Sequence, residues 1–144
     1  MYSKYDNYLP TKGLDILKIE YNKILLRIWD LGGQRQFWKL WPKFAAEASG
    51  IIFVVDSTTN RWSETKKAFE VSKQLNIPYV IFANKQDIID GAESIEVIAE
   101  RLDVPINTIV AGSALLDEGV FTVLDQLTEI MQSVDLEEES KEEV

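Results

Sequence analysis

Carboxylate, glycine and amide residues follow one another in the segment Asp30-Leu31-Gly32-Gly33-Gln34. A carboxylate at a strand end, here Asp30, can hold Mg²⁺ through the ion's water shell, because Mg²⁺ keeps several waters and uses few carboxylates. The glycines let the backbone approach a phosphate, and Gly33 can offer it an N–H. Gln34 can orient an attacking water molecule. Because Gly-Gly after a strand is also an ordinary turn, this segment alone fits a structural role as well.

A second segment, Asn84-Lys85-Gln86-Asp87, carries side chains suited to recognising guanine. The Asp87 carboxylate can accept hydrogen bonds from guanine N1–H and from the exocyclic amine, and it would repel the edge of adenine. Asn84 can brace neighbouring loops, and the Lys85 stem can lie over the plane of the base. The structural alternative is a polar turn after a buried strand, but the order and spacing relative to Asp30 favour guanine recognition.

The elements that must position these residues alternate between strands and helices. The expected strands cover residues 16–21, 24–29, 51–55 and 79–83, with a weaker candidate at 108–111. The polar pair Asn22-Lys23 between the first two predicts a hairpin. The third and fourth strands are continuously apolar, which is typical of parallel strands buried on both faces. Apolar residues at helical spacing around 68–75, 95–102 and 120–134 predict helices, whose stripes we assign to the core.

This alternation predicts an α/β fold with a doubly wound, mainly parallel sheet. In such a sheet, ligands bind outside the carboxyl ends of the strands. Asp30, Asp56, Asn84 and Ser113 each follow one of the expected strands. We therefore expect these residues to meet at one end of the sheet and to form a site there.

Composition excludes several kinds of chemistry. The chain has no Cys and no His, which removes disulfides, thiol nucleophiles, imidazole bases and ordinary zinc sites. A metal ion would therefore be a hard cation with oxygen ligands, Mg²⁺ or Ca²⁺. The net charge of −9 argues against nucleic acid as a partner. No apolar run approaches the length of a membrane span, and neither a secretion signal nor Gly at position 2 is present, so we expect a cytoplasmic protein without a membrane anchor of its own.

Charge is concentrated at the C-terminal end. Residues 135–144 hold six acidic residues and one lysine, so −5 of the net charge lies there. Such a segment is low in apolar residues, and we expect a disordered, solvated tail in preference to a docking motif. Residues 1–134 then form the domain.

The motifs together resemble those of the Arf family of small GTPases. The resemblance rests on Trp29-Asp30-Leu31-Gly32-Gly33-Gln34, Phe53-Val54-Val55-Asp56-Ser57 and Phe82-Ala83-Asn84-Lys85-Gln86-Asp87. Upstream, Pro10-Thr11-Lys12-Gly13 is similar to the family's first switch, and downstream Ser113-Ala114 is similar to its last guanine-binding loop. The likeness runs from about residue 8 to residue 133, and the motifs fall in the family's order.

The resemblance implies a guanine-nucleotide switch that binds GTP or GDP with Mg²⁺ and hydrolyses GTP. It implies that Thr11 and Asp30 serve the Mg²⁺, with Asp30 acting through water, and that the backbone at Ser113 and Ala114 completes guanine recognition. It also implies effector or regulatory proteins as partners. Their expected docking surface is the cluster Leu14, Trp29 and Trp41, where Leu14 replaces the family's usual Phe. Within the polar stretch that follows Gln34, we expect Trp38 and Trp41 to be partly exposed.

The chain departs from the family in one respect. No G-x-x-x-x-G-K-[ST] phosphate-binding loop occurs in these residues, and eight to ten residues precede the Pro-Thr motif, where the family has a strand, that loop and a helix. We therefore expect a Ras-like fold without its first strand, phosphate loop and first helix. Weak GTP and GDP binding and a doubtful GTPase activity follow for this chain alone.

Two alternatives remain open, and the missing strand raises a question of its own. One alternative is a relative that binds no nucleotide and acts as a protein-interaction module. The other is a receiver-like signalling domain with Asp30, Asp56 and Lys85 as its pocket, in which the remaining motif residues would have no role.

The missing strand would lie between the strands at 24–29 and 51–55. These two strands should therefore pair directly, leave an open slot between them, or pair with another chain as an oligomer or a strand-complementing partner.

Overall fold

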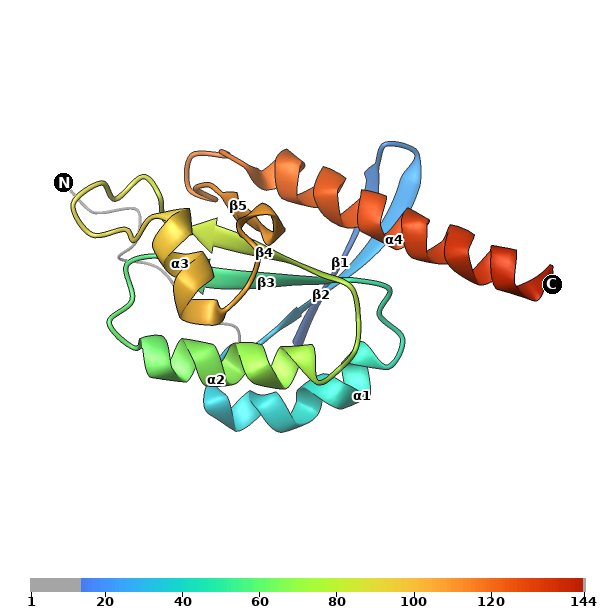
Figure 1. Ribbon diagram of the computed structural model, residues 1–144, viewed down its shortest axis with the longest axis horizontal. Helices are drawn as coiled ribbons and strands as arrows, with labels where there is room; N and C mark the ends of the chain where they lie inside the picture. The colour runs from blue at the N-terminus through green and yellow to red at the C-terminus, as the bar shows by residue number, and fades with distance from the viewer. Residues whose placement is uncertain (1–13, 144) are drawn as a thin grey trace. The chain divides into compact units, whose positions relative to one another are not determined.

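The computed structural model describes residues 14–143 (Figure 1). The chain forms two compact units, Met1–Ala46 and Glu47–Val144, and each is described by itself. The first contains β1 (Leu14–Tyr21), β2 (Ile24–Leu31), η1 (Arg35–Leu40) and α1 (Trp41–Ala45). The second contains β3 (Ile51–Asp56), α2 (Trp62–Lys73), β4 (Tyr79–Asn84), α3 (Ile95–Leu102), η2 (Ile106–Thr108), β5 (Ile109–Ala111) and α4 (Val120–Glu142).

In the first unit, β1 and β2 form the predicted antiparallel hairpin. Asn22 and Lys23 make its two-residue turn with φ of 49° and 64°. Two positive φ values match the twist of the flanking strands, and Asn adopts them at little cost. The ladder runs on to the pair Leu14 and Leu31, so Asp30 lies within β2. The expectation that Asp30 follows the strand was wrong, because cross-strand pairing carries β2 beyond its apolar run.

In the second unit, β3, β4 and β5 form a parallel sheet in that order. The apolar runs are confirmed as parallel strands, and so is the short third strand. The predicted burial holds for β4 but was wrong for β3, which has no described strand on its other side and is mostly half-buried. The register pairs Asp56 with Asn84 and Ala83 with Ala111. The three strands therefore end at the same side of the sheet, where we expected the site.

Helices cover both faces of this sheet (Figure 1). On one face, side chains of α2 and α3 pack on the sheet around Phe69, which is fully buried. On the other face, Val123 and Leu127 of α4 pack on Val80 and Phe82 of β4. The alternation of β4 residues between the two clusters confirms the doubly wound α/β arrangement.

α4 begins at Val120 and continues through the acidic residues to Glu142. Residues 135–143 are all exposed, so this end of the helix buries nothing. The helix differs from the tail that we expected, although its exposure and charge agree with a solvated end; disorder there stays a prediction. Within residues 14–143, α4 included, no helix has the length and apolar character needed to cross a bilayer.

β3 lies at the edge of its sheet. Among residues 14–143 it pairs with a strand on one side only, β4, and the described strands fall into two separate sheets. Val54, in the middle of β3, exposes 58% of its surface. An apolar edge strand of this kind can template pairing with another chain.

Gly112, directly after β5, packs closely against the following loop and the core. A Cβ built on it would lie 2.2 Å from the Glu118 carbonyl oxygen and 2.6 Å from Cε2 of Phe82. We expect Gly112→Ala to lower the free energy of unfolding by about 1–3 kcal/mol, because backbone and core must shift to admit the methyl group. Gly91→Ala is the control, since its Cβ would meet its nearest neighbour at 3.5 Å. Equal urea midpoints for the two variants would contradict this account of Gly112.

Candidate functional site

Two segments about 30 residues apart meet at the carboxyl end of the parallel sheet. Asn84, the last residue of β4, accepts a hydrogen bond on Oδ1 from the backbone N–H of Ala114 at 2.9 Å. Asn84 opens the segment Asn84-Lys85-Gln86-Asp87, which we call the NKQD loop. The predicted bracing role of Asn84 is thus present in the structure, and it joins the NKQD loop to the loop of residues 113–118.

The 113–118 loop is closed on itself. Ser113 and Glu118 exchange two backbone hydrogen bonds of 2.9 Å, and the Ser113 hydroxyl accepts one from the Leu116 N–H at 3.3 Å. Ser113 is fully buried. These bonds fix the loop from which the Ala114 N–H points at Asn84, so the partner of Asn84 is held independently of any ligand.

Asp87 ends the NKQD loop. A turn bond from the Ile88 N–H to the Lys85 carbonyl, 3.1 Å, shapes the backbone around it. Asp87 is half-buried, and its Oδ1 is closed off from solvent. A carboxylate partly removed from water discriminates strongly between donors and acceptors that approach it, because its interactions are less screened.

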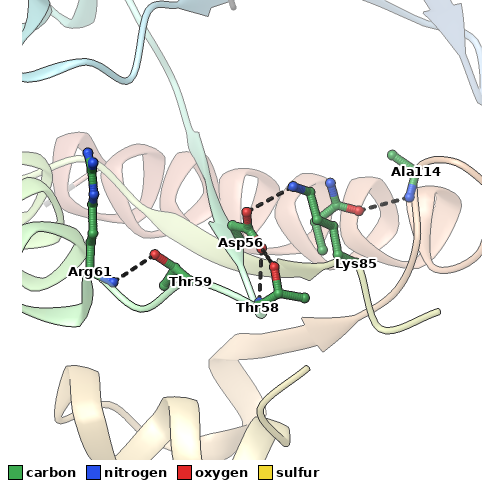
Figure 2. A network of polar contacts seen from close by, with 7 residues as sticks. Asp56, Thr58, Thr59, Arg61, Lys85 and Ala114 are labelled. Atoms are coloured by element: carbon green, nitrogen blue, oxygen red, sulfur yellow. Dashed lines mark hydrogen bonds and ion pairs between the residues drawn. The ribbon is translucent and has the colours of Figure 1, made fainter. Parts of the chain in front are cut away.

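Lys85 forms an ion pair with Asp56, a residue that the sequence analysis placed near it only in the receiver-like alternative. Its Nζ lies 2.8 Å from Oδ2 of Asp56, at the end of β3 (Figure 2). Lys85 has a φ of 68°, unusual for a residue with a side chain. The sequence signal was a charged residue at the end of each of two apolar runs, whereas the strand register that pairs Asp56 with Asn84 comes from the structure. The stem of Lys85 stays our predicted contact for the base, while its ammonium group is held by Asp56.

Asp56 accepts more than one bond. Its Oδ1 accepts from the N–H of Thr58 at 2.9 Å and from the hydroxyl at 2.6 Å. Burial raises the pKa of Asp56, but the hydrogen bonds from Lys85 and Thr58 and the Lys85 charge outweigh it and leave the pKa below its ordinary value. The contribution of Asp56 to stability is therefore complete above its unfolded-state pKa and is lost as the pH falls through its lowered folded-state pKa.

In the first unit, two tryptophans brace the glycine turn. The indole N–H of Trp41 donates to the Gly32 carbonyl at 3.2 Å, and that of Trp38 donates to the Gly33 carbonyl at 3.0 Å. Gln34 is exposed just beyond, and its Oε1 accepts from the Gln36 amide at 3.2 Å. The glycine carbonyls thus face the indoles, which fixes the backbone that carries Gln34.

The expected docking cluster is arranged differently from the prediction. Trp41 is only 8% exposed, so its predicted exposure was wrong: its indole N–H needs the Gly32 carbonyl and its ring packs inside. Trp38, Trp29 and Leu14 are half-buried. Phe44, which we did not single out, meets Trp29 edge-to-face at 5.7 Å between ring centroids.

The assignment of Thr11 and Asp30 as Mg²⁺ ligands stays a prediction. Thr11 lies outside the described residues. Asp30 is exposed and stands opposite Asp15 in the hairpin, where the Asp15 carboxylate accepts from the N–H of Ile16. Nowhere in residues 14–143 do three or more acidic side chains gather as metal ligands.

The structure brings together Asn84, Lys85, Asp87, Ser113 and Ala114 within the second unit. Asp30, Gly33 and Gln34 are grouped within the first unit, with Leu14, Trp29 and Trp41. The parallel sheet, the motif order and the Asn84–Ala114 bond agree with the resemblance to a small GTPase.

Comparison with protein families gives the same class. A model of the ADP-ribosylation factor (Arf) family matches residues 1–131. The chain is 33% identical over 136 residues to ADP-ribosylation factor-like protein 1 of Saccharomyces cerevisiae, covering 88% of this chain and 74% of that protein. It is 35% identical over 132 residues to ADP-ribosylation factor-like protein 2 of Dictyostelium discoideum, covering 82% and 71%. The chain belongs to the Arf family of small GTPases.

Other comparisons cover a smaller part or a more distant relative. The chain is 46% identical over 83 residues to ADP-ribosylation factor-related protein 1 of Bos taurus, and the match spans 54% of this chain and only 41% of that protein. Its fold is similar to that of the Arl6 BBS3 small GTPase from Trypanosoma brucei, solved with the bound nucleotide analogue GppNp. The TM-score is 0.78 at 24% identity, over 89% of this chain and 84% of that one.

Proposed function

We propose that this chain is an Arf-like guanine-nucleotide switch and that its second unit recognises the guanine base. The observation that carries the proposal is the 2.9 Å bond between Asn84 and Ala114. It joins the two loops that the family uses for the base, and hydrogen bonds within the 113–118 loop hold its donor in place. A preorganised site loses less entropy on binding, which supports recognition by these loops even when few contacts are made.

Each residue of this site has a separate role in the proposal. Asp87 accepts hydrogen bonds from guanine N1–H and the exocyclic amine, and it repels adenine, which offers an acceptor at the equivalent ring nitrogen. Asn84 holds the two loops together. The Lys85 stem covers the base plane, and the backbone at Ser113 and Ala114 completes the contacts to the base.

The proposal assigns the phosphate side to the first unit. Thr11 and Asp30 would serve Mg²⁺, Gly33 would offer its N–H to a phosphate, and Gln34 would orient the attacking water in GTP hydrolysis. Bound GTP would supply the phosphoryl group and, together with water, most of the oxygen ligands that Mg²⁺ needs. These residues include no G-x-x-x-x-G-K-[ST], so the affinity of the chain as printed depends on the base contacts.

We further propose that effector or regulatory proteins dock on the hairpin unit. Leu14 and Trp29 supply apolar surface there, and the ring contact between Trp29 and Phe44 adds a third member to the cluster. Trp41 contributes by holding the glycine turn. A cytoplasmic location fits a switch that works through such partners.

Titration calorimetry of the chain with GDP and GTP in the presence of Mg²⁺ tests the nucleotide proposal. We expect dissociation constants no tighter than about millimolar, because base contacts persist without a phosphate cradle. ADP should bind at least about tenfold more weakly. Submicromolar affinity would show that another segment cradles the phosphates. Equal affinity for GDP and ADP, or no binding of either, would overturn the proposal and leave a protein-interaction module as the function.

A further inference from the structure

Two side-chain bridges join consecutive residues of neighbouring loops in the second unit. Asp56 at the end of β3 contacts Lys85, with Oδ2 and Nζ 2.8 Å apart. Ser57 follows Asp56, and Gln86 follows Lys85. The side-chain amide of Gln86 donates a 2.9 Å hydrogen bond to the Ser57 hydroxyl. The loop after β3 is thereby tied to the NKQD loop at two successive positions.

The second bridge is the more buried one. Ser57 is fully buried, and its N–H donates to the Asn84 carbonyl at 3.1 Å. The Gln86 amide also donates to the Glu93 carbonyl at 2.9 Å, and the Gln86 N–H donates to the Gly112 carbonyl at 3.1 Å. Gln86 is therefore held from three sides. It lies between Lys85 and Asp87, the residues proposed to contact the base.

The backbone needs this support. Lys85 adopts a left-handed conformation that is uncommon for a residue with a side chain, and such conformations persist where neighbouring contacts impose them. The Asp56 carboxylate holds the Lys85 ammonium, and Thr58 in turn holds Asp56 with two hydrogen bonds. Neither Asp56 nor Ser57 has a role in the function proposed above.

We propose that Asp56 and Ser57 are positioning residues for guanine recognition: they fix Lys85 and Gln86, and through them Asp87. The proposal rests on the function proposed above. It differs from a purely structural role, because the bridges would then stabilise the fold without changing how a folded molecule binds the base. It also differs from a latch, in which Asp56 would compete with the nucleotide for Lys85.

The test compares Asp56→Asn and Ser57→Ala with wild type and with Thr59→Ala. Thr59 is a matched control: its hydroxyl accepts from the N–H of Arg61 at 3.0 Å in the same loop and bridges nothing in the NKQD loop (Figure 2). GDP is titrated into labelled protein, and amide peaks of the folded state are followed by NMR. Such peaks report affinity per folded molecule, whatever fraction of the variant is unfolded. IDP, whose base lacks the exocyclic amine, is titrated in parallel.

We expect each bridge variant to bind GDP at least about threefold more weakly than wild type and to lose part of its preference for GDP over IDP. Thr59→Ala should match wild type. Unchanged GDP affinity and unchanged preference in both bridge variants would overturn the proposal, and tighter binding by Asp56→Asn would show a latch instead. The Asp56 side chain is 41% exposed, so we expect Asp56→Asn to fold. If Ser57→Ala does not fold, Asp56→Asn alone tests the positioning role. If wild type does not bind GDP at all, the proposed function fails, and the positioning role fails with it.

Discussion

Asp87→Asn should turn a guanine-selective site into a xanthine-selective one. The substitution replaces two acceptor oxygens by one acceptor and one donor. Xanthine presents a carbonyl where guanine presents its amine, so the new donor suits xanthine. Hydrogen bonds to a charged group contribute roughly 1.5–3 kcal/mol each. We expect GDP affinity to fall by at least about tenfold and XDP to bind more tightly than GDP.

The matched control is Asp90→Asn, which removes the same charge at an exposed position in the same connection between β4 and α3. Its GDP and XDP affinities should equal those of wild type. An Asp87→Asn variant that keeps its preference for GDP would remove Asp87 from the base contacts, even if wild type binds guanine nucleotides. A fall in both affinities without a change in preference would assign Asp87 to loop structure.

The chain should self-associate through the edge of β3, and Val54→Lys should weaken this association. Edge strands present backbone donors and acceptors, and each such group that stays buried without a partner costs about 1–3 kcal/mol. Val54 adds an exposed apolar side chain in the middle of that strand. A lysine there would repel the same lysine in a second copy, or its charge would be buried in an apolar contact. We expect at least about tenfold weaker association, measured by sedimentation over a range of concentrations.

Val54→Thr is the control for β3, because threonine keeps the β-branched shape and strand preference without a charge. It should associate like wild type. A wild-type chain that stays monomeric and melts cooperatively above about 60 °C would contradict the edge argument, since that is high for a small domain. Equal association of the lysine and threonine variants would move the contact away from β3.

The sheet of the second unit could be predicted because its strands carry an unambiguous pattern. The continuous apolar runs of β3 and β4 are typical of parallel strands. The residues after them were therefore expected at one end of the sheet. The bracing role of Asn84 was predicted from its amide side chain and from its position at the end of an expected strand. The hairpin followed from Asn22-Lys23, since Asn tolerates the positive φ that a two-residue turn needs.

Other features depend on tertiary contacts that no local pattern encodes. Asp30 falls inside β2 because the strand opposite extends the ladder, not because its own sequence favours a strand. Trp41 is buried with its indole N–H bonded to a carbonyl nine residues away in the chain. The Asp56–Lys85 pair joins residues 29 apart, and only the register of β3 and β4 brings them together. Sequence alone could name the residues of such pairs but not the pairing.

An NMR titration that maps where GDP binds tests the central claim most directly. The claim is that the NKQD loop and the 113–118 loop form one preorganised guanine site. GDP should shift the amide peaks of Lys85, Asp87 and Ala114 together, with one dissociation constant, while ADP at the same concentrations leaves them in place. Shifts scattered over other elements, shifts that ADP reproduces, or an unmoved Ala114 peak would contradict the claim.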